Sequence, residues 1–411
     1  MLSCLESIPD DIECVVLAFS GGLDSCVLLH LLVSSPRSFN LLLWHLNHGL
    51  QESADDMESF CDAQAREYGL EIKTSQLQLD ADMGNLESRA RQARYALFEQ
   101  ELKQGECLLT AHHADDQVET FLLNALRGSS SAGLRGIAKS RPVGQSTLIR
   151  PLLEFSRDEI ATYASRHQLK WFDDPSNASD RFDRNYLRHQ VIPLIKARWP
   201  GYPGSIRTVI ELQAETEALL EELAALDLVS VGQPSDQKDV NSLPRQALCE
   251  LTTARQKNLL RYWLRQHGCA SLPQARLNEL IRQLRTKKSA GPMVRGSGYS
   301  IRVYQQEIFI VPDADPLDLQ ETYEFGQSPV LKIEELGLEI ERENVMHYLD
   351  RRDTGQSIKL KFRIHSNVSN PEHHRLKRLF QSHKIPPWKR SITPQIYLDN
   401  ELAGIWLQGN A

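Results

Sequence analysis

Six consecutive residues near the start of the chain, Ser20 to Ser25, read Ser-Gly-Gly-Leu-Asp-Ser and are suited to binding phosphate. Gly21 and Gly22 let the backbone come close to phosphate oxygens, and N–H groups at the start of a helix donate to them. The segment has no lysine, unlike the longer P-loop that ends in Lys-Ser or Lys-Thr. An ordinary glycine-rich turn is the alternative, but the full pattern between a strand and a helix favours a nucleotide site.

A second group of chemically active side chains lies at 112–120, His-His-Ala-Asp-Asp-Gln-Val-Glu-Thr. Histidines and acids at this spacing suggest zinc, but zinc ligands usually come from more than one segment, and no distant partner is evident. Asp116 and Glu119 share a helix face, as do Asp115 and Glu119. These acids could match the helix dipole, or they could be paired carboxylates that bind an ammonium group. The spacing alone leaves both interpretations open.

The surrounding sequence predicts a parallel α/β sheet as the scaffold for both groups. Residues 14–19 form a short apolar run with β-branched valines, which is typical of a strand buried on both faces. Apolar runs then alternate with helical periodicity, and such alternation gives a Rossmann-like sheet with helices on both faces. Strands are expected at 14–19, 41–46, 72–79, 107–111 and 148–153, and helices at 24–33, 55–68, 87–102, 112–127 and 157–167.

The candidate groups all follow predicted strands. In open α/β sheets, ligands bind at the carboxyl ends of the strands. We therefore expect the loop at 20–25, the pair Asn47-His48 and the pair His112-His113 to meet in one cleft.

Length, composition and charge limit the class of protein. The chain has 411 residues, 41% hydrophobic and 25% charged, which predicts a globular protein of two or three domains. No apolar run is long enough for a membrane span, and the first residues do not resemble a signal peptide. Seven scattered cysteines without a Cys-x-x-Cys motif suit a reducing cytoplasm. The net charge of −7 means that a nucleic-acid partner must be bound by local basic patches.

The remainder of the chain predicts two further domains. A helix is expected over 185–199 and a longer one over 206–226, and polar linkers are expected at 232–239 and 313–318. The region 245–285 has mostly helical periodicity, and a hairpin is expected over 295–311. The expected domains are an α/β domain over 1–205, a mostly helical middle domain over 206–315 and a small α+β domain over 316–411.

The segment Ser20–Ser25 resembles the pyrophosphate loop (PP-loop) of the N-type ATP pyrophosphatases, whose fold is of the adenine nucleotide alpha hydrolase type. With further motifs in order, the chain resembles the tRNA(Ile)-lysidine synthase family, densely over 14–199 and more loosely near the C-terminus. The motifs that carry this resemblance are Ser20–Ser25, Asn47–Leu50, Glu87–Tyr95, His112–Thr120, Arg127–Gly128, Gly133–Gly136, Arg150–Leu153, Asp174–Asn177, Arg184–Arg188, Leu376–Phe380, Ile385–Trp388 and Thr393–Pro394.

The resemblance implies a ligase that uses ATP and Mg²⁺ to join free L-lysine to the wobble cytidine of an isoleucine tRNA. ATP would adenylate the C2 oxygen of cytosine with release of pyrophosphate, and the lysine amine would then displace AMP. A homodimer is compatible with the sequence. The rival interpretations are another tRNA-directed PP-loop enzyme, such as a thiolating enzyme, and a tRNA-binding protein with a vestigial nucleotide site. Thiolation usually needs paired cysteines, which are absent, and the intact loop argues against a vestigial site.

The resemblance also implies roles for individual residues. Asp116 and Glu119 would hold the lysine side-chain ammonium, and Asp24 would bind Mg²⁺ or orient the loop. Arg184 and Arg188 lie four apart and could neutralise phosphate or tRNA charge, with a solvated helix face as the alternative. The expected catalytic residues are Asp24, Asp116, Glu119 and Arg188, and the expected nucleotide-binding residues are Ser20, Gly21, Gly22, Leu23, Asp24, Ser25, Asn47, His48 and Arg94.

Basic residues near the C-terminus form a candidate tRNA-contacting patch. They stand out against the negative net charge, and two aromatic residues that could be core lie among them. The patch comprises Lys359, Lys361, Arg363, Arg375, Lys377, Arg378, Lys384, Lys389 and Arg390, with Phe380 and Trp388 interleaved; Arg282, Arg285, Lys287 and Lys288 form a second candidate.

Overall fold

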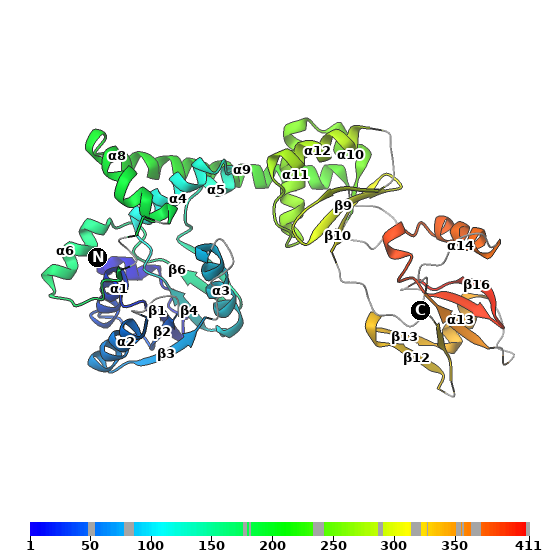
Figure 1. Ribbon diagram of the computed structural model, residues 1–411, viewed down its shortest axis with the longest axis horizontal. Helices are drawn as coiled ribbons and strands as arrows, with labels where there is room; N and C mark the ends of the chain where they lie inside the picture. Colours follow the sequence, from blue (N-terminus) through cyan, green and yellow to red (C-terminus); the bar gives the residue numbers. More distant parts are fainter. Residues whose placement is uncertain are drawn as a thin grey trace. The chain divides into compact units, whose positions relative to one another are not determined.

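The computed structural model divides the chain into two compact units, residues 1–219 and 220–411 (Figure 1). The expected domain limits at 205 and 315 stay predictions. His48, Ser176, Asn177, Lys287, Lys288 and Arg363, which were singled out in the sequence, lie outside the described residues. The structure describes residues 1–47, 54–77, 86–175, 179–180, 182–232, 242–286, 291–313, 322–326, 328–350, 355, 357–362 and 371–407.

A six-stranded sheet forms the centre of the first unit, in the order β3-β2-β1-β4-β6-β5. All neighbouring strands are parallel except β5, which forms an antiparallel hairpin with β6. The predicted α/β fold class is confirmed, but β5 was missed because its four residues include a proline and no apolar run. The strands are β1 (Cys14–Ala18), β2 (Leu41–Asn47), β3 (Glu71–Gln76), β4 (Glu106–Leu109), β5 (Ser140–Val143) and β6 (Ser146–Ile149).

Helices cover both faces of this sheet because its central strands are apolar on both sides. In β1, Val15 and Leu17 pack with α1, α2 and α6, whereas Val16 packs against Phe98 of α3 on the opposite face. The helices of this unit are η1 (Leu2–Ser7), α1 (Leu23–Val33), α2 (Ala54–Tyr68), α3 (Leu86–Glu101), α4 (Ala114–Leu126), α5 (Ser131–Leu134), α6 (Arg157–Arg166), α7 (Asp183–Tyr186), η3 (Leu187–Val191), α8 (Ile192–Arg198) and the start of α9 (Tyr202–Val231).

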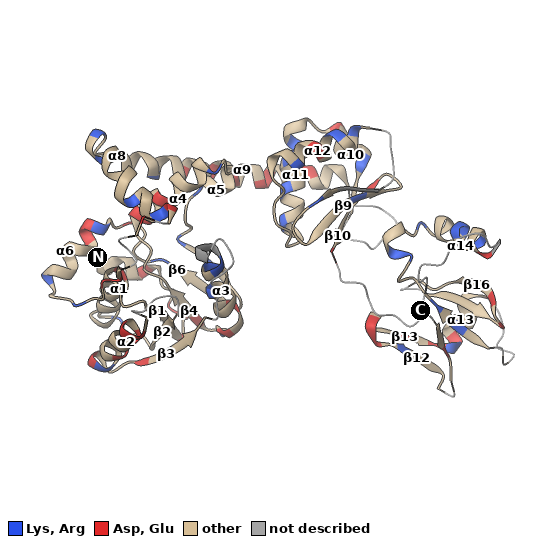
Figure 2. Ribbon diagram, viewed as in Figure 1, with Lys and Arg blue, Asp and Glu red and all other residues tan. Residues whose placement is uncertain are grey.

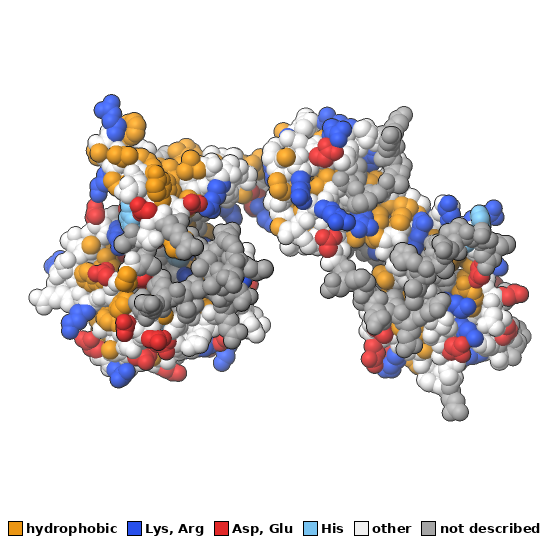
Figure 3. All heavy atoms as spheres, in the orientation of Figure 1, with side chains coloured by type: hydrophobic (Ala, Val, Ile, Leu, Met, Phe, Trp, Pro, Cys, Tyr) orange, Lys and Arg blue, Asp and Glu red, His pale blue; other side chains and the backbone are white. Residues whose placement is uncertain are grey.

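The helix expected over 185–199 is interrupted. The segment η3 is a π-helical turn between α7 and α8. Pro193 lies in the first turn of α8, and a proline ring clashes with the carbonyl four residues earlier in a regular α-helix. The wider π turn relieves that clash, and such turns often occur at functional sites. Figure 3 shows apolar side chains gathered over this region, and the exposed ones include Leu194, Trp199 and Leu212.

The second unit contains two antiparallel sheets of four strands, ordered β7-β10-β9-β8 and β11-β14-β15-β16, and a β12-β13 hairpin. Three helices, α10 to α12, form one core with the first sheet. The region over 245–285 is therefore helical, as expected. The hairpin expected over 295–311 is part of a larger sheet of four strands. The elements are β7 (Ser242–Pro244), α10 (Arg245–Glu250), α11 (Thr253–Gln266), α12 (Gln274–Arg285), β8 (Gly291–Arg295), β9 (Tyr299–Tyr304), β10 (Glu307–Pro312), β11 (Thr322–Glu324), β12 (Val330–Ile333), η4 (Glu334–Leu336), β13 (Leu338–Glu341), α13 (Arg342–Tyr348), β14 (Ile358–Lys361), α14 (Pro371–Ser382), η5 (Pro387–Lys389), β15 (Gln395–Leu398) and β16 (Glu401–Ile405).

Within the described part of the chain, no helix combines the length and apolarity that crossing a bilayer requires.

The turn between β1 and α1 brings its backbone against α2. Gly21 has φ of +75°, and a Cβ at this position would lie 3.0 Å from the Cys61 sulfur and 3.1 Å from the Phe60 ring. The Gly21 carbonyl also accepts a hydrogen bond from the Phe172 backbone N–H at 2.8 Å. Gly21 therefore meets both a conformational and a steric requirement for glycine.

Alanine at Gly21 should destabilise the protein. We expect the free energy of unfolding to fall by about 1–2 kcal/mol, because alanine would adopt a left-handed conformation and crowd Cys61. Gly22→Ala is the matched control, since Gly22 has φ of −75° and its added Cβ would lie 3.6 Å from the Ser20 hydroxyl. Urea denaturation of both variants measures the difference, and equal losses would contradict the strain argument.

Candidate active site

The loop from Ser20 to Ser25 joins β1 to α1 at the carboxyl edge of the parallel sheet. Gly22 is the N-cap residue of α1, and no described side chain caps the helix, so its first N–H groups can donate to a ligand. The Ser25 hydroxyl donates to the Gly22 carbonyl at 2.9 Å and lies 3.2 Å from the Ser20 hydroxyl. Leu23, the first residue of α1, is partly buried against the core. The loop thus has the backbone conformation of an anion site.

Helix α4 begins at the end of the neighbouring strand β4 and carries the acidic group. The Asp116 Oδ2 atom accepts a hydrogen bond from the His113 backbone N–H at 2.9 Å, which fixes the first turn of the helix. The Asp115 carboxylate lies 3.7 Å from Nδ1 of His113 and accepts a hydrogen bond from the Arg157 backbone N–H at 2.8 Å. The hydrogen bond from His113 therefore fixes the Asp116 carboxylate in the first turn of α4, which follows the carboxyl end of β4.

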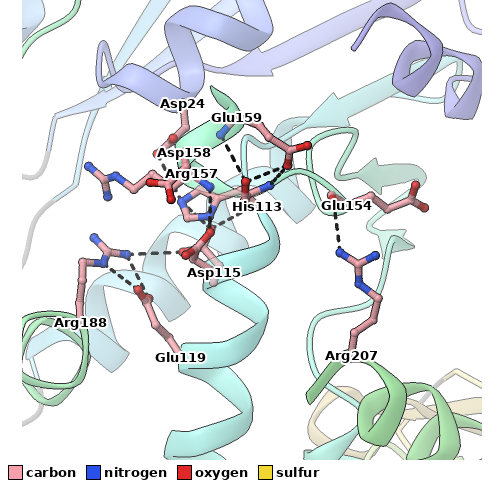
Figure 4. A network of polar contacts seen from close by, with 12 residues as sticks. Asp24, His113, Asp115, Glu119, Glu154, Arg157, Asp158, Glu159, Arg188 and Arg207 are labelled. Atoms are coloured by element: carbon pink, nitrogen blue, oxygen red, sulfur yellow. Dashed lines mark hydrogen bonds and ion pairs between the residues drawn. The ribbon is translucent and has the colours of Figure 1, made fainter. Parts of the chain in front are cut away.

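His113 connects the phosphate loop to the acids of α4 (Figure 4). Its Nε2 atom lies 3.7 Å from Asp24 Oδ2 and 3.6 Å from Asp116 Oδ2, and the residue is only 2% exposed. The carboxylates of Asp24 and Asp116, which are far apart in the sequence, thus meet at the same imidazole nitrogen. The sequence suggested His113 as a metal ligand and predicted that the pair His112-His113 lies in the same cleft as the phosphate loop, but it did not indicate this connecting role of His113.

Two arginines from the interrupted helix bind the acids of α4. Arg188 forms a two-pronged contact with Glu119, Nε to Oε1 at 2.7 Å and Nη2 to Oε2 at 3.0 Å (Figure 4). Arg184 bridges both acids, with Nε 2.6 Å from Glu119 Oε2 and Nη2 3.0 Å from Asp116 Oδ1. The site therefore holds two carboxylates and two guanidinium groups. Neither arginine lies on a solvated helix face.

The surroundings shift the pKa values of the two aspartates in opposite directions. Burial raises the pKa of the Asp24 carboxyl above its ordinary value and outweighs the opposing interactions with His113 and with nearby arginines. Burial also disfavours the charge of Asp116, but His113 and Arg184 outweigh it and hold the pKa of the Asp116 carboxyl below its usual range. Asp116 is thus kept ionised and suited to binding a cation. Desolvation lowers the pKa of His112 to about 3, so its ring is neutral.

The other predicted nucleotide-binding residues lie around this centre or in the neighbouring helix. Asn47 ends β2 and is buried, with its amide donating to Glu58 of α2 at 2.8 Å. Arg94 lies on α3, where burial lowers the pKa of its guanidinium. The adjacent Tyr95 ring contacts Arg91 and Arg141, whose guanidinium carbons are 5.1 and 4.4 Å from its centroid. Arg91 and Arg141 therefore form a positively charged cluster with Tyr95 that lies on α3 and β5.

One side chain of the phosphate loop suits a divalent ion. Asp24 Oδ1 is buried and has no hydrogen-bond partner among the described residues, so it offers an oxygen of the kind that Mg²⁺ prefers. In the part of the chain that the structure describes, no three His, Cys, Asp or Glu side chains are grouped as a metal site. Asp24 fits an ion that takes most of its ligands from phosphates and water.

Comparison with known proteins decides the family. Models of three domains match consecutive segments: a PP-loop domain at 3–195, a TilS substrate binding domain at 243–309 and a TilS substrate C-terminal domain at 350–409. The tRNA(Ile)-lysidine synthase of Pectobacterium atrosepticum is 34% identical over 395 residues, which cover 94% of this chain and 88% of that protein. That of Alkalilimnicola ehrlichii is 37% identical over 412 residues, covering 96% and 89%.

The chain belongs to the tRNA(Ile)-lysidine synthase family. The resemblance seen in the sequence is confirmed. In this lysidine synthase family member, the PP-loop match includes the phosphate loop, the acids of α4 and both arginines. The substrate binding match spans β7 to β10, and the C-terminal match includes α14. The middle of the chain, where the sequence offered no recognisable motif, is therefore also part of the family's architecture.

Asp24→Asn should stabilise the ligand-free protein, because one oxygen of the partly buried carboxylate is enclosed and has no hydrogen-bond partner among the described residues. The pKa of Asp24 is raised in the folded state, so its destabilising effect is present above that pKa and disappears as the pH falls below the unfolded value. The gain in thermal midpoint should thus be largest near neutral pH and shrink on acidification. A gain that grows on acidification would contradict this assignment, and Asp158→Asn on the exposed start of α6 is the control.

Proposed function

We propose that this protein joins free L-lysine to C2 of the wobble cytidine, position 34, of isoleucine tRNA(CAU), and so forms lysidine. Family membership supports this function, and one geometric observation supports it most. The phosphate loop and the α4 acids converge through His113, with contacts of 3.7 and 3.6 Å. An activated nucleotide and a cationic amino acid could therefore meet at one place. The rival thiolating activity is not favoured by the matching domains.

The proposed reaction has two steps. The C2 oxygen of cytosine attacks the α-phosphorus of ATP, and pyrophosphate leaves. The neutral side-chain amine of lysine then attacks C2, and AMP leaves with the former C2 oxygen. Backbone N–H groups of the 20–25 loop and the hydroxyls of Ser20 and Ser25 would hold phosphates, and Asp24 would hold Mg²⁺, which neutralises phosphate charge.

Asp116 and Glu119 would bind the lysine side-chain ammonium. The lowered pKa of Asp116 keeps it ionised, which favours binding of the cation but makes it a weak acceptor for the proton that the amine must lose. The two acids are therefore assigned to selecting and placing lysine. Arg188, held by Glu119 through two hydrogen bonds, would keep that carboxylate oriented.

The tRNA would be held by basic side chains outside the α/β unit. Figure 2 shows Lys and Arg along α14, where Arg375, Lys377 and Arg378 are exposed. Phe380, by contrast, is buried in a core and serves packing. Lys359 is paired with Glu324 at 2.8 Å, so its charge is partly compensated. The exposed face of α14 is thus the best candidate for phosphate contacts.

A homodimer stays a prediction, for which the exposed apolar side chains of α8 and α9 are the supporting observation.

The direct test is product analysis. Isoleucine tRNA is incubated with the protein, ATP and L-lysine, and the anticodon nucleoside is examined by mass spectrometry. The cytidine should gain the mass of lysine less one water, and pyrophosphate should appear only when tRNA is present. Pyrophosphate release that does not depend on the identity of the tRNA, with no lysine joined to the cytidine, would contradict the proposal.

Glu119→Gln should raise the KM for lysine by about tenfold or more while leaving the KM for ATP nearly unchanged, because a buried carboxylate partner of a cation is lost. Steady-state kinetics with each substrate varied in turn measures the split. Glu217→Gln is the control, since Glu217 is a similarly buried acid that accepts from Ser131 at 2.8 Å. Equal changes in both constants would remove Glu119 from the lysine site.

Lys377→Ala/Arg378→Ala should weaken tRNA binding and flatten its salt dependence, because each cation that no longer neutralises a phosphate makes the slope of log K against log salt shallower by about 1. Filter binding over a series of salt concentrations measures this slope. Lys332→Ala is the control, because the charge of Lys332 is compensated by Glu339. If the double variant keeps the wild-type slope, Lys377 and Arg378 do not neutralise phosphates of the tRNA.

A further inference from the structure

The Arg184 side chain lies between the two carboxylates that the proposed function assigns to lysine. We propose that Arg184 is a placeholder: its guanidinium occupies the ammonium site in the free protein, and lysine binds by displacing it. This inference rests on the proposed function and adds a residue that sets lysine affinity. Three observations support it. They are the carboxylate oxygens that Arg184 binds, the balance of positive and negative charge in the site, and the way each arginine is held.

Arg184 binds one carboxylate oxygen of each acid. Asp116 Oδ2 is engaged by the His113 backbone N–H, and Glu119 Oε1 is engaged by Arg188 Nε. Arg184 bridges the other two oxygens, Asp116 Oδ1 at 3.0 Å and Glu119 Oε2 at 2.6 Å, and Arg188 Nη2 also donates to Glu119 Oε2 at 3.0 Å. An ammonium group has three donors and could satisfy the same two oxygens. A lysine that used both acids would therefore compete directly with Arg184.

The charge of the site leads to the same conclusion. The two acids of α4 balance the two guanidinium groups, Asp24 is assigned to Mg²⁺ in the proposed function, and Glu119 is only 1% exposed. A third cation added without release of another would leave an uncompensated positive charge in a poorly solvated site, which is costly. Exchange of one cation for another keeps the balance.

Arg184 is the easier of the two arginines to release. Its two hydrogen bonds to the acids go to two different carboxylates, whereas Arg188 binds the single carboxylate of Glu119 in the two-pronged geometry, which is the stronger arrangement. Arg184 also lies on α7, a helix with no buried residue, whereas Arg188 follows Leu187, which is buried and anchors the π turn. Segments with few buried contacts move at lower cost. Arg188 therefore stays with Glu119 while Arg184 leaves.

The test is lysine affinity without turnover. Binding of radiolabelled L-lysine to the full chain is measured by equilibrium dialysis, with an ATP analogue that carries a methylene bridge between its α- and β-phosphates. Arg184→Met removes the competing cation, so its Kd for lysine should be about tenfold lower than that of the wild type, within the usual range of such couplings. Arg184→Lys retains a competing cation and should bind lysine as weakly as the wild type. Arg198→Met, an equal charge loss at an exposed position of α8, should change nothing.

An unchanged or higher Kd in Arg184→Met would overturn the placeholder role. A purely structural role predicts that outcome, because loss of a buried pair would disorder the acids. If Arg184→Met does not fold, Arg184→Gln removes the same charge and carries the same expectation. Product analysis of the wild type separates the two proposals. Lysidine formation together with no gain in lysine affinity rejects only the placeholder, whereas absence of lysidine rejects the proposed function.

Discussion

The candidate active site depends on keeping four charges together in a place with little access to water. Glu119 and Asp116 lie almost out of solvent contact, and each is bound by arginines from a different part of the chain. Loss of one partner from such a pair typically costs about 3–5 kcal/mol, so the arrangement strongly constrains where α4 and the interrupted helix can lie. The same charges that hold these elements together are the ones that a cationic substrate would use.

The phosphate loop obeys a different constraint, that of backbone conformation. A strand that ends at the rim of the sheet must reverse into α1 within a few residues, and Gly21 adopts a left-handed conformation against α2 to do so. The tight reversal leaves the first N–H groups of α1 directed to the rim. Because α4 starts at the same rim, after the strand next to β1, the carboxylates of Asp24 and Asp116 both lie next to Nε2 of His113. The parallel order of β1 and β4 thus places the phosphate loop and the acids of α4 at the same edge of the sheet.

Much of the α/β unit was predictable from local patterns. Buried strands such as β1 and β4 are short apolar runs, and the helices between them repeat their apolar residues at helical spacing, so most predicted limits agree within a few residues. The misses have local causes. Strand β5 contains a proline at the edge of the sheet, α5 is a single turn inside a glycine- and serine-rich loop, and Pro193 produces a π turn where continuous helix was expected.

The sequence by itself determined the chemistry that is available: a glycine loop for phosphates, a helix with paired acids, and arginines spaced four apart. Each of these depends on residues that are close along the chain, where backbone propensity and side-chain type decide the outcome. Only the tertiary structure decided the partners. That Arg184 and Arg188 bind Glu119 and Asp116, rather than facing solvent, depends on contacts across more than sixty residues of sequence, which no local periodicity encodes. Those long-range contacts turn separate motifs into one site.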